Sequence, residues 1–303
     1  MSIISSKELL YGILSVAMAS AVLSGCGNKN KGEDLPMNEN IHIQLGQSGD
    51  DILKKYPGRF VLSDHPSGAK FYVGKWTKGA RGTIEVGPAE TTFSVTQALS
   101  VTGNYSPSFP SENIIEWNIN AGLGDSSTIM HEAARQQFRS ILERLRKASW
   151  NRYIDPDAPR LSGTEAIRYA QSVSSVYGLD PDYLPTLEEW MQLPGRTLWK
   201  FWSKDAYLTI ALSRDLSRDD VNQPGSYFVE FDLKSEKEQF RKLVGPGKRT
   251  TWQQELPAEM SLLKKDRQRA ENDLRHRGIK IDETYRDPPA ISSPLAYQNK
   301  PHS

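Results

Sequence analysis

The segment His131-Glu132-Ala-Ala-Arg135 is the stretch of this chain that comes closest to a helical metal site. In the zinc motif H-E-x-x-H, two histidines one turn apart face the same ion, and the glutamate acts as a general base. Here the second ligand position holds Arg135, whose positive charge opposes cation binding. None of the remaining histidines has a His or Cys at ligand spacing (His42, His65, His276 and His302). We therefore expect no metal site, and we predict that His131 and Glu132 belong to the first turn of a helix.

Two aspartate pairs and one glycine pair could also bind ions. Asp155-Pro-Asp157 and Asp180-Pro-Asp182 offer carboxylates, but a calcium loop needs more oxygen ligands and a glycine at its sharp turn. Asx turns and helix capping are therefore their predicted roles. Gly122-Leu-Gly124 precedes a predicted helix, where backbone amides can bind an anion, although a plain turn leading into the helix is expected. Glu188-Glu189 suits the positive end of a helix dipole.

Catalytic motifs give no further candidates. No nucleophile elbow, Walker loop or dinucleotide-binding turn follows a predicted strand. We therefore assign no catalytic residue, no cofactor-binding residue and no cofactor. An enzyme is accordingly the less favoured expectation.

Two larger groups could form binding surfaces. Residues 258–277 mix cations and acids, which favours a solvated helix face with one narrow apolar seam, and contact with anionic lipid or a partner is the alternative. The cations are Lys264, Lys265, Arg267, Arg269, Arg275 and Arg277; the acids are Glu259, Asp266, Glu271 and Asp273; the seam is Met260, Leu263, Ala270 and Leu274. The densest aromatic cluster comprises Trp190, Trp199, Phe201, Trp202 and Tyr207. Core packing is its predicted role, and a groove for sugars or peptides is the alternative.

Cys26 is the single cysteine among the 303 residues, so no disulfide can form within the chain. It follows a short polar stretch with Lys7 and an apolar stretch from Ile13 to Leu23. An apolar run of this length is typical of a signal peptide and is too short to span a membrane. The small residues Ser24 and Gly25 suit a signal peptidase pocket. The sequence therefore predicts a signal peptide over residues 1–25.

The run Leu23-Ser24-Gly25-Cys26 resembles the lipobox of bacterial lipoproteins. The resemblance implies that signal peptidase II recognises Leu23, Ser24 and Gly25 and cleaves before Cys26. It further implies a diacylglyceryl group on the Cys26 thiol and acylation, with a fatty acid such as palmitate, of the new N-terminus. Two or three acyl chains hold a protein stably on a membrane, whereas one binds only marginally.

The residues after the lipobox indicate where the anchor leads. In the lipoprotein sorting pattern, an aspartate after the lipidated cysteine retains the protein in the inner membrane, and this chain has Gly27 there. We therefore expect the outer membrane, facing the periplasm, with the inner membrane as the alternative. Residues 26–40 contain few apolar side chains, which predicts a flexible tether.

Beyond the tether, apolar residues recur with periods of two and of about 3.6, which predicts an α+β fold. Residues 41–121 form a first, strand-rich unit with a short helix that begins at Ser48 and ends at Pro57-Gly58. Its strands are expected at 41–45, 59–63, 69–76, 83–86, 91–101 and 114–119. Because few helices lie between neighbouring strands, we expect antiparallel pairing.

Residues 122–285 form a second predicted unit, with a helix, then an antiparallel sheet, then a helix. Helices are expected at 126–150, 162–176, 235–244 and 257–277, the last closed by Gly278, and strands at 197–202, 206–212 and 227–233. Capping boxes are predicted at Ser162–Glu165, Thr186–Glu189 and Ser235–Glu238. The proline-containing residues 286–303 are expected to be disordered.

The first unit also shows a limited resemblance to the SmpA/BamE-like lipoproteins of the outer-membrane barrel assembly machinery. It is carried by Leu45-Gly46, Ile52 and Tyr56-Pro57. Those lipoproteins likewise join a lipobox and a tether to helices beside a small antiparallel sheet. The helix pair of that family is not evident in this sequence.

Charge and motif content favour one class of function. The net charge of +1 provides no overall field for nucleic acid. The lipobox and the missing catalytic motifs favour a non-catalytic, lipid-anchored, periplasm-facing protein that binds another protein. Such a protein could be an envelope assembly factor or an immunity lipoprotein that neutralises a toxin. The alternative is a periplasmic cell-wall or envelope hydrolase with an unrecognised site.

Overall fold

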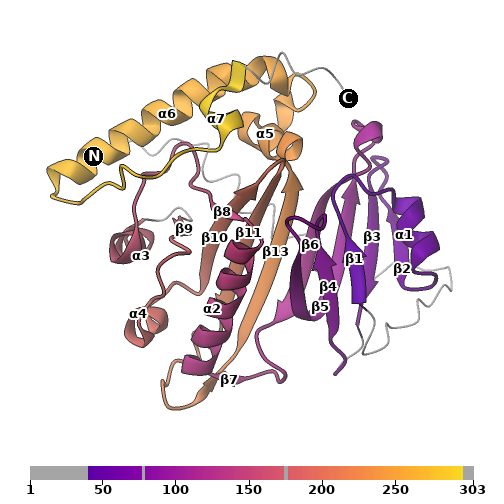
Figure 1. Cartoon of the computed structure of the whole chain (residues 1–303), viewed down its shortest axis with the longest axis horizontal. Coiled ribbons are helices and arrows are strands. Elements are labelled where there is room, and N and C mark those ends of the chain that lie inside the picture. The colour runs from indigo at the N-terminus through magenta and orange to yellow at the C-terminus, as the bar shows by residue number, and fades with distance from the viewer. Residues whose placement is uncertain (1–39, 77–78, 174–176, 296–303) are drawn as a thin grey trace. The chain divides into compact units, whose positions relative to one another are not determined.

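A computed structural model describes residues 40–76, 79–173 and 177–295, and it confirms the predicted α+β class (Figure 1). The described strands form one sheet of eleven strands and a separate pair. The sheet contains β1 (Asn40–Ile43), β2 (Phe60–Asp64), β3 (Lys70–Lys75), β4 (Gly82–Val86), β5 (Phe93–Tyr105), β6 (Ile114–Gly122), β8 (Asn151–Arg152), β9 (Gly178–Leu179), β10 (Arg196–Ser203), β11 (Ala206–Arg214) and β13 (Tyr227–Ser235). The pair is β7 (Ile129–Met130) with β12 (Pro224–Gly225). Hydrogen-bonded neighbours follow the order β1-β4-β5-β6-β13-β11-β10-β8, with β2-β3 added to β5 and β9 to β10.

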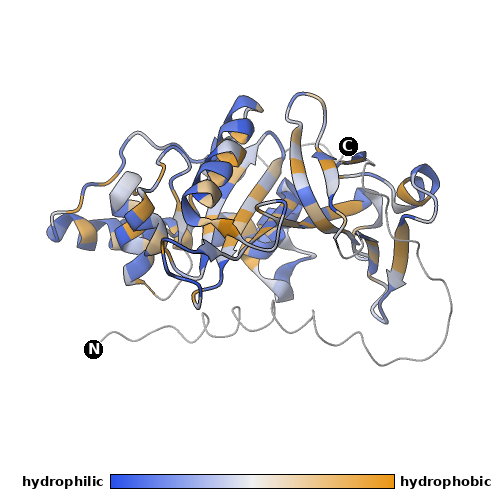
Figure 2. Ribbon diagram, turned by 90° about the horizontal axis from the view of Figure 1, so that it is seen from below, coloured by the Kyte–Doolittle hydropathy of each residue, from blue (hydrophilic) through white to orange (hydrophobic). Residues whose placement is uncertain are grey.

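Apolar and polar residues alternate along most strands, which gives the sheet one buried face (Figure 2). In β6, for example, Trp117, Ile119 and Ala121 are buried, while Asn118 and Asn120 between them are partly exposed. Period-two alternation has this effect because successive side chains point to opposite faces of a strand.

Strand β5 is the longest strand, and it pairs with two different strands along one edge. Its first half pairs with β4 and its second half with β3, while β6 pairs along the opposite edge. The change of partner coincides with register shifts around Gln97, whose φ is 60°. A β-bulge of this kind bends a strand, so β5 bends at the place where its partner changes from β4 to β3.

The sheet is antiparallel, as predicted, except at two places. β1 pairs parallel with β4, and β9 pairs parallel with β10. The chain between β1 and β4 contains α1 (Gly49–Lys55) followed by β2 and β3, and the chain between β9 and β10 contains α4 (Leu187–Met191). Such a connection returns the chain to the starting end of the sheet, as parallel pairing requires.

The boundary predicted at residue 122 coincides with the end of β6, yet the sheet continues across it. β6 pairs with β5 on one side and with β13 on the other. Residues on both sides also contribute to one buried cluster, which includes Ile43 and Trp199. The two predicted units therefore share one sheet and one core.

The remaining helices are α2 (His131–Lys147), α3 (Gly163–Ser172), α5 (Glu236–Val244), α6 (Trp252–His276) and α7 (Pro289–Ser292). Helix α2 is shorter than its predicted range of 126–150, because Ile129 and Met130 pair with β12. At its other end Ser149 has a φ of 62°, and Trp150 N donates to Leu145 O. Helix α3 stops at Ser172, since Val173 is extended, and residues 174–176 lie outside the described chain.

The three predicted capping boxes have different outcomes. The Thr186–Glu189 box is confirmed in full. Ser235 accepts a hydrogen bond from Glu238 N, but the Glu238 carboxylate binds Arg249 instead of returning to the cap. The Ser162 box is wrong: the Ser162 side chain makes no cap, and Asp180 Oδ2 accepts from Gly163 N. A carboxylate from a distant loop thus replaces the local cap.

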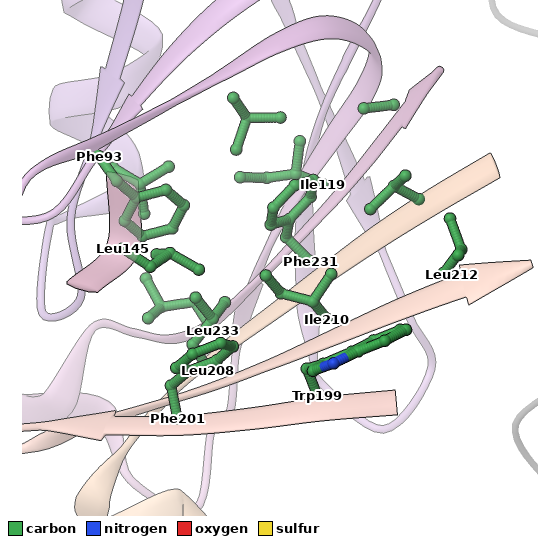
Figure 3. Packing of buried hydrophobic residues seen from close by; sticks show 14 of the residues in the cluster. Phe93, Ile119, Leu145, Trp199, Phe201, Leu208, Ile210, Leu212, Phe231 and Leu233 are labelled. Atoms are coloured by element: carbon green, nitrogen blue, oxygen red, sulfur yellow. The ribbon is translucent and has the colours of Figure 1, made fainter. Parts of the chain in front are cut away.

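The core lies between the buried sheet face and α2 (Figure 3). Phe138 and Leu145 of α2 are almost fully buried, and the ring centroids of Phe138 and Trp199 are 4.4 Å apart. Phe93 of β5 packs against Phe231 of β13 with centroids 6.3 Å apart, which brings the two parts of the sheet together. This packing holds α2 over β5, β6 and β13, where the site described below is located.

Helix α6 and the segment after it differ from their predictions. The helix begins at Trp252, because Thr251 O accepts from the amides of Gln254 and Glu255, and Pro257 lies within it. Of the tail predicted to be disordered, residues 286–295 are described and pack against α6. Ile291 is completely buried, and Asp287 pairs with Arg267 at 2.9 Å. The remaining residues 296–303 lie outside the described chain.

Candidate cavity beside helix α2

A surface cavity of about 310 Å³ lies between α2 and the strands β5, β6 and β13. Its floor is apolar and almost fully buried, and it includes Val95, Ala121, Leu123, Val229 and Phe231. Its rim is polar and exposed, with Thr96, Asp125, Gln137, Ser140 and Arg144. Ligand sites commonly combine an apolar lining with a few polar groups, and this volume is near the lower end of their usual size.

Helix α2 presents two neighbouring stripes, and the cavity uses one of them. Ala134, Phe138, Leu142 and Leu145 form the buried stripe that packs into the core. The stripe beside it carries Gln137, Ser140, Ile141 and Arg144, which line the cavity. Positions three and four apart share a helix face, so the spacing of these four residues directs all of them to one place.

Gln97 lines the cavity in a strained backbone conformation. Its φ of 60° lies in the left-handed region, which residues other than glycine rarely adopt. The side-chain amide donates from Nε2 to Asp125 Oδ1 at 2.6 Å, while Gln97 Oε1 is enclosed without a partner among the described residues. Strained residues cluster at functional sites, so Gln97 supports the choice of this cavity.

Arg144 is the one arginine of α2 for which the described chain provides no side-chain partner. Arg135 pairs with Glu132, Arg139 with Glu143, and Arg146 with Asp182. The sequence explains the difference, because no Asp or Glu stands three or four positions from Arg144. An unpaired guanidinium at the rim is available to an external anion.

The lining of the cavity contains hydroxyl groups that can form hydrogen bonds with a ligand. Ser94, Thr96 and Ser140 supply hydroxyl groups, but no histidine is among the described residues that line it. A serine nucleophile usually needs an adjacent base to accept its proton.

His131 is buried at the start of α2 and belongs to a hydrogen-bonded group of its own. Trp190 Nε1 can only donate, so Tyr227 Oη accepts from it at 2.9 Å and donates to His131 Nδ1 at 2.5 Å. His131 therefore carries its proton on Nε2, enclosed near the backbone of Arg218 and Asp220. Burial and the charge of Arg214 lower the pKa of His131, although those backbone carbonyls raise it.

The other residues of the zinc-like segment have structural partners. Glu132 accepts from Arg135 and Gln136, and these hydrogen bonds lower its pKa to about 2. Arg135 also donates to Pro185 O at 2.9 Å. Within the described ranges, no group of three potential His, Cys, Asp or Glu ligands is close enough to hold a metal ion.

The structure also shows the roles of the aspartate and glycine pairs that were considered as ion sites. Asp180 caps α3 and accepts from Asp182 N at 3.0 Å, which is an Asx turn. Asp155 pairs with Lys200. Gly122-Leu-Gly124 leads into β7 rather than directly into a helix, and Gly122 and Leu123 line the cavity. Glu188 and Glu189 lie in the first turn of α4, as predicted.

The aromatic cluster is buried, whereas the charged face of α6 is mostly exposed. Trp190, Trp199, Phe201 and Tyr207 are nearly fully buried, so their predicted role in the core is confirmed. On α6, Lys265, Arg269 and Asp273 are exposed, in agreement with the predicted solvated face, while Arg267 and Glu271 are buried and are exceptions to it. Arg267 binds Asp287 and backbone oxygens at Asp155 and Ala158, while Glu271 binds Arg160.

Sequence reasoning identified none of Gln97, Asp125 and Arg144 as site residues. One feature of the sequence could have pointed to Arg144, because it has no Asp or Glu three or four positions away on the predicted helix. Leu23, Ser24, Gly25 and Cys26 lie outside the described residues. Among the helices that the structure describes, none is long and apolar enough to cross a membrane.

Comparison with known proteins provides no family for this chain. No protein-family model matches it, and no curated protein or solved structure is significantly similar.

Proposed function

We propose that this chain is a lipid-anchored protein that binds another protein through the cavity beside α2. The lipid would be attached at Cys26, with the folded part facing the periplasm from the outer membrane. An envelope assembly factor and a toxin-immunity lipoprotein are both consistent with this role.

One observation carries the proposed binding role. An apolar floor, of which Ile141 is the partly exposed member, lies beneath a ring of exposed polar side chains, and one cation of that ring, Arg144, has no partner in the described chain. Protein interfaces combine buried apolar anchors with a polar rim in the same way. The cavity is large enough for one bulky side chain of a partner.

The proposed anchor is supported by the resemblance of Leu23-Ser24-Gly25-Cys26 to a lipobox and by Gly27 after it. The described fold begins at Asn40, so the residues between Cys26 and Asn40 would separate it from the lipid. At about 3.3–3.6 Å per extended residue, this segment can reach on the order of 40–50 Å.

The binding role can be tested by photo-crosslinking in the native bacterium. A photoreactive benzoylphenylalanine at Gln137, on the rim, should crosslink to a partner protein. The same group at Arg139, exposed on the opposite side of the same helix and outside the cavity lining, should not. Ser140→Trp should fill the opening and remove the crosslink from Gln137. Equal crosslinking from both positions, or a crosslink that survives Ser140→Trp, would contradict the proposal.

A further inference from the structure

The charges around the cavity indicate which part of a partner it could receive. Arg144 supplies a cation without a partner among the described residues. Asp125 supplies a carboxylate whose Oδ1 accepts from Gln97, while none of the described hydrogen bonds reaches its Oδ2. The rim therefore offers one site for an anion and one acceptor for an N–H group.

The floor adds a third requirement, an apolar side chain. Ile141 is partly exposed and lines the cavity together with Val95, Val229 and Phe231, which are at most 2% exposed, and none of the four has a polar atom in its side chain. A polar or charged side chain placed against them would lose its hydration without gaining hydrogen bonds. The volume of about 310 Å³ suits one residue better than a longer segment.

We infer that the cavity receives the C-terminal residue of a partner polypeptide, with its α-carboxylate at Arg144 and its apolar side chain on the floor. The backbone N–H of that residue would donate to Asp125. This inference rests on the proposed protein-binding function and specifies its ligand. An internal apolar residue has the side chain and the N–H but no carboxylate of its own, so Arg144 would need a separate acidic side chain as its partner. A C-terminal residue complements all three features of the cavity.

The guanidinium is well suited to this task. An arginine can donate two parallel hydrogen bonds to one carboxylate, and such charge-assisted bonds are stronger than bonds between neutral groups. The rim is exposed, so the attraction should weaken as the salt concentration rises. A C-terminal amide cannot accept in this bidentate manner and carries no charge.

The test uses two fluorescein-labelled tetrapeptides of sequence Gly-Ser-Gly-Phe, one with a free carboxylate and one amidated. Their binding to the full-length processed protein in detergent is followed by fluorescence anisotropy. We expect the free acid to bind about tenfold more tightly than the amide, a difference that corresponds to about 1.4 kcal/mol. Equal binding of the two peptides, or binding of neither, would overturn the inference.

Variants locate the preference at Arg144. Arg144→Gln should lower the affinity for the acid to that for the amide, and Arg144→Lys should restore part of the difference. Lys147→Gln removes a cation from the same helix outside the cavity and should leave the ratio unchanged. A ratio that Arg144→Gln does not alter would contradict the assignment. Displacement of the acid by an equal concentration of free phenylalanine would contradict the choice of a polypeptide terminus.

This test can fail separately from the proposed function. If neither peptide binds while Ser140→Trp still removes the crosslink at Gln137, the C-terminal ligand is wrong and protein binding stands. If neither peptide binds and the photoreactive group at Gln137 forms no crosslink in the protein with Ser140 intact, both proposals are wrong.

Discussion

The guanidinium of Arg241 stacks on the ring of Phe109, with Cζ 3.5 Å from the ring centroid. Arg241 belongs to α5, and Phe109 belongs to the loop between β5 and β6. The same guanidinium binds Glu112 of that loop and Glu238 of its own helix, and the Arg241 side chain is only 1% exposed. This buried cation therefore connects α5 to the loop that joins β5 and β6.

Replacement of Arg241 should destabilise the protein strongly. Arg241→Ala leaves Glu112 without its buried partner and Glu238 with Arg249 alone, and the loss of one member of a buried ion pair typically costs about 3–5 kcal/mol. Lys242→Ala removes the neighbouring cation, whose ion pair with Glu116 is much more exposed, and should cost less than about 1 kcal/mol. Urea denaturation of both variants measures the difference. Equal decreases in the free energy of unfolding would show that the buried contact stabilises the protein no more than the exposed ion pair does.

The stability of the protein should fall in mild acid through His131. Burial and Arg214 lower the pKa of this histidine in the folded state, whereas an unfolded histidine titrates near about 6.5. Protons therefore favour the unfolded chain below that pH, so this contribution is complete above about 6.5 and is lost as the pH falls. His131→Gln should flatten the dependence of the unfolding free energy on pH between about 7 and 5.

A matched control for this effect is His65→Gln, because His65 lies in an exposed turn between β2 and β3. Its replacement should leave the pH dependence as it is in the wild type. If His131→Gln leaves the slope of the unfolding free energy against pH unchanged, the buried His131 ring does not cause the pH dependence.

The cap of α3 gives a prediction in which the distant residue matters and the adjacent one does not. Asp180→Ala removes the acceptor of both Gly163 N and Asp182 N and should cost about 1–2 kcal/mol. Ser162→Ala should change the unfolding free energy by no more than about 0.5 kcal/mol, since the Ser162 side chain makes no cap. Thermal unfolding of the two variants measures both losses. A larger loss of stability for Ser162→Ala than for Asp180→Ala would contradict the prediction.

Lipid attachment is tested at Cys26. Cys26→Ser should yield an unprocessed chain without lipid, because the serine hydroxyl cannot replace the thiol in lipid transfer. Labelling with a fatty-acid analogue and gel mobility measure the outcome. Mature mobility together with label in the variant would contradict the lipobox assignment.

Local patterns in the sequence were sufficient for much of the secondary structure. The alternation of Ile41 and Ile43 predicts β1, and the spacing of Ala134, Phe138 and Leu145 predicts the buried stripe of α2. The Thr186–Glu189 capping box is local as well. These predictions succeed because strand alternation, helix periodicity and capping depend on residues only a few positions apart.

The candidate cavity and several corrected details depend on residues that are distant in the sequence. The burial of Arg267 follows from its contacts with Asp287 and the backbone of Asp155, which a helical pattern cannot reveal. Gln97 and Asp125 meet Arg144 around one opening because β5 and β6 pair and α2 packs over them. The sequence alone predicted most of the secondary-structure elements and the candidate anchor, through short-range periodicity and the lipobox. Only tertiary packing decided which distant side chains share a cavity, because that depends on how the sheet and α2 come together.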